Sequence, residues 1–494
     1  RLTFYKIIDY LLCCWYKFAW TISPLVVHKR KGLKIMTLPN VAYFSMEIAM
    51  DQSLKTYSGG LGFLAGSHML SAGYLQMPMV GVTMLWSYGY YDQRIDHSGN
   101  VEVAYIRKYY DYLVDTGITV EVDTFGEKVK VKAFRVDPEL FGTCPVYLLT
   151  TDIDGNSDWA KSISHKLYDG NERIRIAQET VLGIAGVRVL QAAGYNFDVI
   201  HMNEGHALPA AFELLRQYNG NLDEVRRKTV FTTHTPVAAG NEVHWVDTLL
   251  EKRMNGDKSF DELLAAKREM KEELFKYVAN VAGKRFNPDV LTITWARRFA
   301  DYKRAWLILM DKDRINKLLD ENKVQIIFAG KFHPDDVMGK EMFNKLLNRS
   351  HTLKNVVVLP GYELQLSGML KRGTDVWLNT PLRPFEASGT SGMSANANGA
   401  LHLSTFDGWT VEGTFPGING YTVEYPELDD DMPWEERHWK DHECMMDIIE
   451  NQIIPTYYNN KQEWARMMRQ AIRTAEAYFN SDRMVIEYYN RLYK

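Results

Sequence analysis

The stretch "VLTITWARR" (290–298) decides the fold, because it is a short apolar run that ends directly in charged residues. Such a run is typical of a strand buried on both faces of a sheet. The pattern returns in "VQIIFAGK" (324–331), "NVVVLPGY" (355–362) and "TDVWLNTP" (374–381), with helical stretches between the runs. Strands that alternate with helices over short loops predict a parallel sheet covered by helices on both faces.

The first half of the chain repeats this alternation. We expect strands at 41–46, 79–86, 128–136, 144–152 and 229–236, a strand running into a polar turn at 197–207, and helices at 59–75 and 173–194. A chain of 494 residues is also too long for one ordinary core. The sequence therefore predicts an α/β protein with two doubly wound, Rossmann-like domains at residues 36–255 and 256–444, followed by helices at 445–494.

Residues 1–35 differ from the rest of the chain. The segment "IIDYLLCCWYKFAWTISPLVV" (7–27) is long enough to cross a membrane, but it contains Asp9 and Lys17, which are costly in hydrocarbon. The chain begins with Arg1, and "MTLPNVAYFSMEI" at Met36 resembles a natural start followed by a strand. We expect residues 1–35 to be read-through from upstream of the true start and to lie outside the fold. The alternative is a membrane anchor.

The composition excludes several classes of protein. A net charge of −4 gives no support for nucleic-acid binding. The four cysteines (Cys13, Cys14, Cys144 and Cys444) form no CxxC pair and no cluster with histidine at metal-binding spacing. We therefore predict a cytoplasmic protein without a metal site. The charged stretch "ELDDDMPWEERHWKDHE" (427–443) is expected to be a solvated surface loop.

Polar residues follow the predicted strands, and parallel sheets bind ligands at this edge. Four cations (Arg297, Arg298, Lys303 and Arg304) lie at the end of the stretch 290–298 and just after it. They predict an anion site, the alternative being a basic helix start on the surface. In "YSGGLGFLAG" (57–66), Gly60 opens a helix where a backbone amide can approach an anion or a sugar. Tight turns explain such glycines equally well.

Histidines follow two other strands. His206 lies in "HMNEGH" (201–206) and His234 in "TTHTP" (232–236). Both are candidates for a shared cleft, although lone histidines are more often structural. Glu204 is a candidate acid or a partner for sugar hydroxyls.

The stretch "EASGTSGMSANANGALHLS" (386–404) is predicted to be a ligand-binding loop at a strand end. The Glu386 carboxylate can accept hydrogen bonds from two sugar hydroxyls, and the amides that follow, including those of Ser388, Gly389 and Thr390, can donate to hydroxyls or to a phosphate. A plain loop before a capped helix is the alternative.

Taken together, these motifs resemble the α-glucan (glycogen, starch or maltodextrin) phosphorylases, particularly their short prokaryotic type. The resemblance runs from about Met36 to the C-terminus, and its most specific parts are "SGGLG", "HMNEGHALPAAFELL", "TTHTP", "ARRFADYKRA" and "EASGTSGM…NGALHLS…DGW". It implies a two-domain fold of the glycosyltransferase B type with a C-terminal crossover helix. It also implies phosphorolysis of terminal α-1,4-glucosidic bonds, which gives α-glucose 1-phosphate with retention of configuration.

The resemblance further implies roles for individual residues. It places Glu386, Ser388 and Gly389 on the glucose hydroxyls and His234 against the sugar ring. We add Glu204, His206 and Tyr302 as candidate substrate-binding residues. The resemblance places Gly60, Arg298 and Lys303 on the substrate phosphate, and Arg297 and Thr390 on the phosphate of a pyridoxal phosphate cofactor. The implied partners are an α-1,4-glucan or maltooligosaccharide and inorganic phosphate, and a homo-oligomeric assembly is compatible with the sequence.

The sequence departs from the family pattern in two places. The family lysine that binds pyridoxal phosphate as an imine falls at Ser394, and serine cannot form this bond. No lysine lies between Lys371 and Lys440, so no neighbour along the chain can replace it. The region after "HTPVAAGNE" is also shorter than in the family, with the junction expected near Val243–Trp245.

These observations leave three hypotheses. The leading one is an α-glucan phosphorylase-like enzyme. The second is a glucan glycosyltransferase that uses a nucleotide sugar, although Ser394 also replaces the second glutamate of such enzymes. The third is a glucan-binding relative without activity, which the missing lysine and the shortened region favour.

Overall fold

The computed structural model describes residues 38–234, 259–426 and 432–493. Arg1–Leu38 and Pro39–Lys494 separate as two units, and the described helices and strands all belong to the second unit. The predicted extension at 1–35 and the predicted junction near Val243–Trp245 both lie outside the described residues. Among the described residues, no helix is long and apolar enough to cross a membrane.

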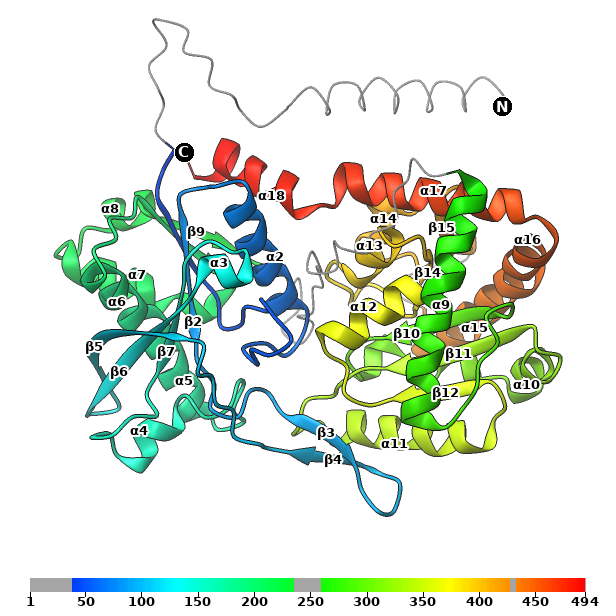
Figure 1. Ribbon diagram of the computed structural model, residues 1–494, viewed down its shortest axis with the longest axis horizontal. Coiled ribbons are helices and arrows are strands. Elements are labelled where there is room, and N and C mark those ends of the chain that lie inside the picture. Colours follow the sequence, from blue (N-terminus) through cyan, green and yellow to red (C-terminus); the bar gives the residue numbers. More distant parts are fainter. Residues whose placement is uncertain (1–37, 235–258, 427–431, 494) are drawn as a thin grey trace, which may run out of the picture. The chain divides into compact units, whose positions relative to one another are not determined.

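The second half of the chain forms a six-stranded sheet in which every pairing is parallel (Figure 1). The strand order is β12-β11-β10-β13-β14-β15. In chain order the strands are β10 (Leu291–Ala296), β11 (Val324–Ala329), β12 (Val356–Leu359), β13 (Val376–Asn379), β14 (Leu401–Thr405) and β15 (Gly420–Val423). Strand β10 lies inside the sheet, with Leu291 paired to Val324 and Ile293 to Val376. The four apolar runs of the sequence are thus the first four strands, as predicted.

The first half forms a seven-stranded sheet in the order β5-β6-β7-β2-β1-β8-β9. Its strands are β1 (Val41–Phe44), β2 (Met79–Met84), β5 (Val114–Thr124), β6 (Glu127–Val136), β7 (Val146–Thr150), β8 (Val199–Asn203) and β9 (Thr229–Thr232). From β7 to β9 the pairings are parallel, whereas β5, β6 and β7 pair antiparallel. A separate antiparallel hairpin is formed by β3 (Asp92–Ile95) and β4 (Val101–Ala104). The predicted α/β class with two sheets rich in parallel strands is confirmed.

Helices surround both sheets. In the first half they are α2 (Gly60–Tyr74), α3 (Pro138–Phe141), α4 (Asp158–Ser162), α5 (Glu172–Thr180), α6 (Gly186–Ala192), α7 (Pro209–Gln217) and α8 (Leu222–Arg227). In the second half they are α9 (Phe260–Ala282), α10 (Lys312–Asp320), α11 (Val337–Thr352), α12 (Leu364–Gly373), α13 (Ser391–Asn396), α14 (Thr410–Gly413), α15 (Trp434–Ile448), α16 (Ile454–Asn459), α17 (Lys461–Tyr478) and α18 (Ser481–Glu487).

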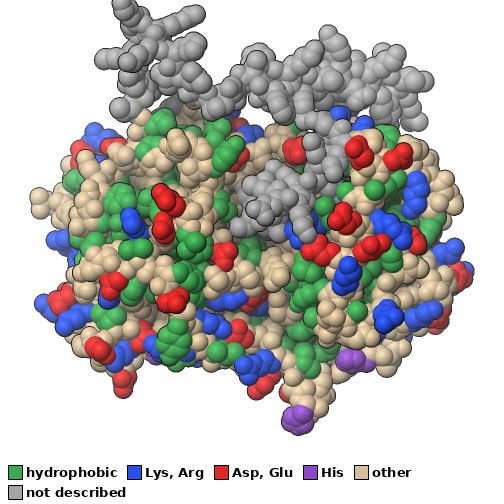
Figure 2. Space-filling view, in the orientation of Figure 1, with side chains coloured by type: hydrophobic (Ala, Val, Ile, Leu, Met, Phe, Trp, Pro, Cys, Tyr) green, Lys and Arg blue, Asp and Glu red, His purple; other side chains and the backbone are tan. Residues whose placement is uncertain are grey.

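Successive residues of a strand pack into two different hydrophobic cores, because each sheet is covered on both faces. In β11, Ile326 and Phe328 belong to one buried cluster, whereas Ile327 and Ala329 belong to another. On the face drawn in Figure 2, acidic and basic side chains are interspersed over the surface.

The C-terminal helices connect the two halves of the chain. Helix α17 packs into the core of the second sheet through Trp464 and Ile472. Val485 of α18 and the nearby Tyr493 pack instead into the core beside β1 and α2, and the Tyr493 hydroxyl lies 2.6 Å from His201 Nδ1. Figure 1 shows this segment running from α17 to α18, next to α2. The predicted return of the C-terminus to the first half is present.

Two predictions about loops are wrong. The stretch 386–404 contains helix α13 and strand β14. The stretch 427–443 contains the start of α15, on which Arg437, Asp441 and His442 are buried. Asp441 pairs with Arg304 at 2.6 Å, so charges that look solvated in the sequence are used inside the fold.

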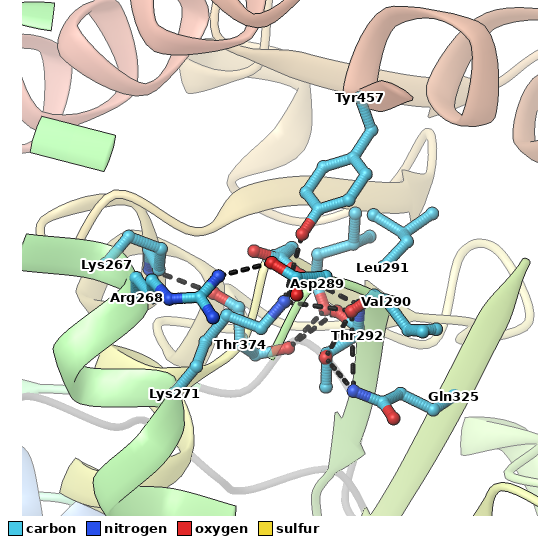
Figure 3. Close-up of polar contacts among 12 residues, drawn as sticks. Lys267, Arg268, Lys271, Asp289, Val290, Leu291, Thr292, Gln325, Thr374 and Tyr457 are labelled. Atoms are coloured by element: carbon cyan, nitrogen blue, oxygen red, sulfur yellow. Dashed lines mark hydrogen bonds and ion pairs between the residues drawn. The ribbon is translucent and has the colours of Figure 1, made fainter. Parts of the chain in front are cut away.

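Two buried lysines of α9 hold the second sheet (Figure 3). Lys267 Nζ donates to the carbonyl oxygens of Arg372, Thr374 and Asn398, each at 2.9 Å. Arg372 lies in the last turn of α12, Thr374 lies between α12 and β13, and Asn398 lies between α13 and β14. Lys271 Nζ lies 2.5 Å from Asp375 Oδ2, 2.9 Å from the Val290 carbonyl and 3.1 Å from the Tyr457 hydroxyl. The segment that carries α13 is therefore fixed at both ends.

Candidate active site

A buried ion-pair cluster lies at the ends of two neighbouring strands. Arg297 follows β10, and Glu386 follows β13. Arg297 Nη2 donates to Glu386 Oε1 at 2.8 Å, and Lys303 Nζ lies 3.6 Å from the same oxygen. All three side chains are at most 3% exposed. The structure thus brings together three residues that the sequence placed in one site.

This cluster has unused hydrogen-bonding capacity. Arg297 Nε and Nη1 and Glu386 Oε2 are buried without a hydrogen-bond partner among the described residues. Buried polar atoms are normally paired, and such exceptions mark places where a ligand or water binds. Burial acts to raise the pKa of Glu386, but the charges of Arg297 and Lys303 outweigh it and lower the pKa below its ordinary value. Glu386 is therefore an ionised acceptor between two cations.

The turn that carries Glu386 is held by Asp407, which the sequence analysis did not select. Asp407 Oδ2 accepts from the Glu386 backbone N–H at 2.9 Å, and Oδ1 accepts from the Gly408 N–H at 2.8 Å. Burial, with a smaller contribution from the charge of Glu386, raises the pKa of Asp407 to about 6. The motif "DGW" contains Asp407, and its position just after strand β14 is the feature of the sequence that could have identified it.

Gly408 allows this turn to close against the strand-end loop. It has a φ of +59°, and a Cβ there would lie 2.7 Å from the Ser388 carbonyl oxygen. The Trp409 N–H donates to the same oxygen at 2.8 Å. The backbone of Ser388 is therefore fixed, and Gly389 and Thr390 follow it into α13, with Thr390 as the N-cap residue.

The four cations after β10 do not act together. Arg304 Nε donates to the Thr380 carbonyl, and its Nη2 binds the Pro381 carbonyl and Asp441. It is therefore a structural residue and not part of the anion site that the sequence predicted. Arg298 and Tyr302 belong to the same strand-end segment, and the Lys303 ammonium lies 5.3 Å from the centroid of the Tyr302 ring.

Glu204 and His234 form a second unit, at the ends of β8 and β9. Glu204 Oε1 accepts from the His234 N–H at 2.6 Å, and Oε2 accepts from the Thr233 hydroxyl at 3.2 Å. His234 Nε2 lies 2.8 Å from Asn203 Oδ1, and burial lowers the pKa of His234 to about 4. Glu204 therefore holds Thr233 through its side chain and His234 through its backbone N–H, using one carboxylate oxygen for each.

A chain of contacts runs from His206 through Tyr168 and Glu47 to the turn that precedes Gly60. The His206 ring lies 5.7 Å from that of Tyr168, and burial lowers the pKa of His206 to about 4. Tyr168 donates to Glu47 Oε1 at 2.7 Å, and Glu47 Oε2 accepts from the N–H groups of Ser58 and Gly59. Gly60 then begins α2, whose N-terminus has no side-chain cap. Uncapped N–H groups of a helix N-terminus favour an anion.

A pocket of about 390 Å³ lies beside Tyr168. It is lined by Tyr105, residues 166–171 and residues 333–335, which follow strand β11. The Lys166 ammonium lies 4.2 Å from the centroid of the Tyr105 ring. Aromatic faces together with amide, carboxylate and imidazole groups suit a polyhydroxylated ligand.

Ser394 lies in the middle of α13, and its hydroxyl serves its own helix. Ser394 Oγ lies 3.3 Å from the Thr390 carbonyl and 3.2 Å from the Ser391 carbonyl. Such bonds from serine to the preceding turn are common in helices.

Comparison with known proteins identifies the family. The family description "Carbohydrate phosphorylase" matches residues 240–414. The chain is 32% identical to the maltodextrin phosphorylase of Thermococcus litoralis over 593 aligned positions, which cover 92% of this chain and 70% of that protein. The chain belongs to the carbohydrate phosphorylase family. It is also 39% identical to an uncharacterised protein of Methanocaldococcus jannaschii, covering 92% of this chain and 99% of that protein.

A more distant phosphorylase aligns over almost the whole chain. The glycogen phosphorylase of Aquifex aeolicus is 26% identical, and the alignment covers 97% of this chain and 89% of that protein.

The 593 positions aligned with the Thermococcus enzyme include about 454 residues of this chain (92% of 494), so about 139 positions of that enzyme have no counterpart here. These gaps agree with a shortened carbohydrate phosphorylase, and the position of the shortening stays a prediction.

Members of this family normally use pyridoxal phosphate, and the residues present fit that cofactor only in part. The unused donors of Arg297 suit a phosphate group. Position 394 does not suit the aldehyde, because a serine hydroxyl cannot form an imine. A cofactor bound as in the family pattern therefore has no covalent partner at Ser394.

Proposed function

We propose that this chain is a glycosyltransferase of the α-glucan phosphorylase type. It would transfer the terminal glucosyl unit of an α-1,4-glucan to inorganic phosphate and release α-glucose 1-phosphate. The observation that carries this proposal is the buried cluster of Arg297, Lys303 and Glu386, which combines two cations with an ionised carboxylate at two adjacent strand ends.

The cations supply the phosphate side of the reaction. Lys303, together with Arg298 and the backbone N–H of Gly60, would hold the attacking phosphate. Arg297 would use its free Nε and Nη1 toward a second phosphate group, that of the cofactor, with the hydroxyl of Thr390. Pyridoxal phosphate, when bound, would supply a phosphate beside the substrate phosphate. Buried cations stabilise the negative charge of a phosphate more strongly than exposed cations do.

The carboxylate of Glu386 would bind the sugar. Glu386 would accept hydrogen bonds from glucose hydroxyls through Oε2, which has no partner in the described structure, while the amides of Ser388 and Gly389 donate to other hydroxyls. Asp407 fixes the backbone from which Glu386 extends. His234, neutral and held by Glu204 and Asn203, would lie against the sugar ring.

The remaining glucan would occupy the pocket beside Tyr168. Tyr105 and Tyr168 offer aromatic faces, and His206, whose ring contacts that of Tyr168, would offer a further polar contact. Tyr302, next to Lys303, would be a substrate-binding residue on the phosphate side. In this arrangement the glycosidic bond breaks as positive charge develops on the sugar ring, as in glycoside hydrolysis. A held hydrogen phosphate would then be both the nearby anion and the nucleophile: its oxygen bonds to the anomeric carbon as the glycosidic bond breaks, and its proton passes to the oxygen of the leaving glucan. The link from Tyr168 through Glu47 to the glycine turn before Gly60 supports a continuous site.

One experiment separates this proposal from its two alternatives. The purified chain is mixed with maltoheptaose and phosphate, with and without pyridoxal phosphate, and glucose 1-phosphate is measured; ADP-glucose or UDP-glucose is then supplied and chain extension is measured. We expect phosphate-dependent release of glucose 1-phosphate. Extension without release would instead support a nucleotide-sugar transferase. Glucan binding without either reaction would support an inactive relative.

A further inference from the structure

Helices α9 and α12 carry three buried lysines, and one of the three lacks a hydrogen-bonding partner. Lys267 and Lys271, on α9, each reach three oxygen atoms (Figure 3). Lys371, on α12, is 0% exposed, and its Nζ has no hydrogen-bond partner among the described residues. A buried ammonium without a partner is costly, so this side chain requires an explanation that the fold does not give.

The position of Lys371 relates it to the candidate active site. Leu364, Ser367 and Lys371 lie on one face of α12, because their spacing brings successive turns of a helix together. Leu364, at the start of this face, packs with Tyr57 and with Phe63 of α2, close to the glycine turn. The face of α12 that carries Lys371 therefore begins beside the proposed phosphate-binding turn.

Helix α12 also packs against α13, which carries Ser394 (Figure 1). The Lys371 Nζ lies 5.9 Å from the centroid of the Trp377 ring, and Trp377 Nε1 donates to Ser391 Oγ of α13 at 3.3 Å. One indole ring thus connects Lys371 with α13. On α13 itself, the fully buried side chain of Asn396 has no hydrogen-bond partner among the described residues for either amide atom. Two packed helices therefore carry unsatisfied polar groups.

The environment also keeps the Lys371 amine reactive. Burial lowers the pKa of Lys371 to about 7, so a large fraction of the amine is neutral at neutral pH. A neutral amine is the form that attacks carbonyl groups, and buried lysines of this kind form imines with pyridoxal phosphate. Neighbours along the chain cannot replace a lysine at position 394, but Lys371 lies on a helix that packs against α13 and is linked to it through Trp377.

We propose that Lys371 is the residue that binds an aldehyde cofactor of the pyridoxal phosphate type, from α12 instead of from position 394. The amine nitrogen attacks the aldehyde carbon, a C=N bond replaces the C=O bond, and the carbonyl oxygen leaves as water with the two amine hydrogens. The step needs no oxidant or reductant. The choice of cofactor rests on the proposed function, whereas the choice of lysine rests on the burial and position of Lys371.

The test maps the bond directly. The full-length chain is incubated with pyridoxal phosphate, its absorbance spectrum is recorded, the imine is reduced with borohydride, and the modified lysine is located by peptide mass spectrometry. We expect a stoichiometric adduct on Lys371. Lys371→Met should lose this adduct, whereas the matched variant Lys345→Met should keep it, since the Lys345 side chain is 80% exposed. Ser394→Lys provides a chain with the lysine of the family pattern.

The outcomes are distinct. An adduct on exposed lysines only, or an adduct at position 394 of Ser394→Lys with none on Lys371 of the unmodified chain, would overturn the inference. Mapping on the unmodified chain needs no variant to fold. Glucose 1-phosphate is measured on the same samples. Release of glucose 1-phosphate without an adduct on Lys371 overturns this inference but supports the proposed function. An adduct on Lys371 without release supports this inference but contradicts the proposed function.

Discussion

At the scale of single residues, Glu386 both neutralises the two cations beside it and keeps one oxygen available for a ligand. Its Oε1 occupies the position between Arg297 and Lys303 that an anion would take, while its Oε2 is left for a hydroxyl. Internal pairing of this kind keeps the buried cations compensated when no ligand is bound. It also means that, in the proposed site, inorganic phosphate competes with Glu386 for the Lys303 ammonium.

Glu386→Gln should therefore change the two affinities in opposite directions. Glucose should bind more weakly, because an amide accepts fewer hydrogen bonds than a carboxylate. Phosphate should bind about tenfold more tightly, a change of about 1.4 kcal/mol, because the competing negative charge is gone. Calorimetric titration of each ligand measures both changes. Unchanged or weaker phosphate binding would contradict the competition.

The same substitution leaves two cations buried without their anion, which costs about 3–5 kcal/mol in comparable pairs. The variant should unfold at a lower temperature than the unmodified chain. Added phosphate should recover more of the melting temperature in the variant than in the unmodified chain, since a ligand stabilises in proportion to its occupancy.

At the scale of elements, α9 fixes the segment that carries the site. Lys267→Met would leave the buried carbonyls of Arg372, Thr374 and Asn398 without their donor. Each unsatisfied buried group costs about 1–3 kcal/mol, so the free energy of unfolding should fall by about 3 kcal/mol or more. Urea unfolding measures the change. The matched control is Lys276→Met, on the exposed side of the same helix, which should unfold like the unmodified chain. Equal stability of the two variants would refute this role.

The turn at Asp407 provides a second test at this scale. Asp407→Asn replaces one of the two acceptor oxygens with a donor, so either the Glu386 N–H or the Gly408 N–H loses its partner. The carboxylate of Glu386 should then be less well positioned, and glucose affinity should fall by about tenfold, for a loss of about 1–1.5 kcal/mol. Phosphate affinity should change little, because Arg297 and Lys303 extend from another strand. A parallel loss of both affinities would indicate general unfolding instead.

The elements differ in how far the sequence could predict them. Strands β10 to β13 were predictable because residues such as Ile326 and Ile327 face opposite cores and must both be apolar. Helix α13 and strand β14 were not, because their many small residues resemble a loop. Gly392 shows the reason: a Cβ there would lie 2.6 Å from His402 Nε2 and 2.7 Å from Trp409 Nε1, so this glycine serves close packing.

The residues of the site show the same limit. Arg297, Lys303 and Glu386 were predictable because each follows a strand of one parallel sheet. The role of Arg304 was not, because its partner Asp441 comes from a distant helix that the charge pattern suggested was solvated. The sequence likewise could not predict that Lys371 is buried without a hydrogen-bond partner among the described residues, because this depends on how α12 packs.

At the scale of the whole molecule, buried histidines predict sensitivity to acid. Burial lowers the pKa of His68 and His402 to about 3 and that of His206 and His234 to about 4. Above pH 6.5 these groups are neutral in both the folded and the unfolded chain. Below it the unfolded chain binds protons that the folded chain does not, so stability should fall as the pH decreases from about 6.5 toward 4.

Asp407 acts in the opposite sense, because its pKa is raised in the folded chain. Four histidines should outweigh this one carboxyl group. Urea unfolding at pH 7.5, 6 and 5 should therefore show a progressive loss of stability. Constant stability over this range would mean that the histidines are not buried as described.

The central claim is that the cluster of Arg297, Lys303 and Glu386 uses inorganic phosphate to cleave a glucan. The most direct measurement follows the phosphorus signal by magnetic resonance while the purified chain acts on maltoheptaose. We predict that the phosphate signal decreases as α-glucose 1-phosphate appears, that Lys303→Met reduces the rate by at least a hundredfold (about 2.7 kcal/mol), and that Lys345→Met leaves it unchanged. Formation of no phosphate ester, or an equal rate in Lys303→Met, would contradict the account.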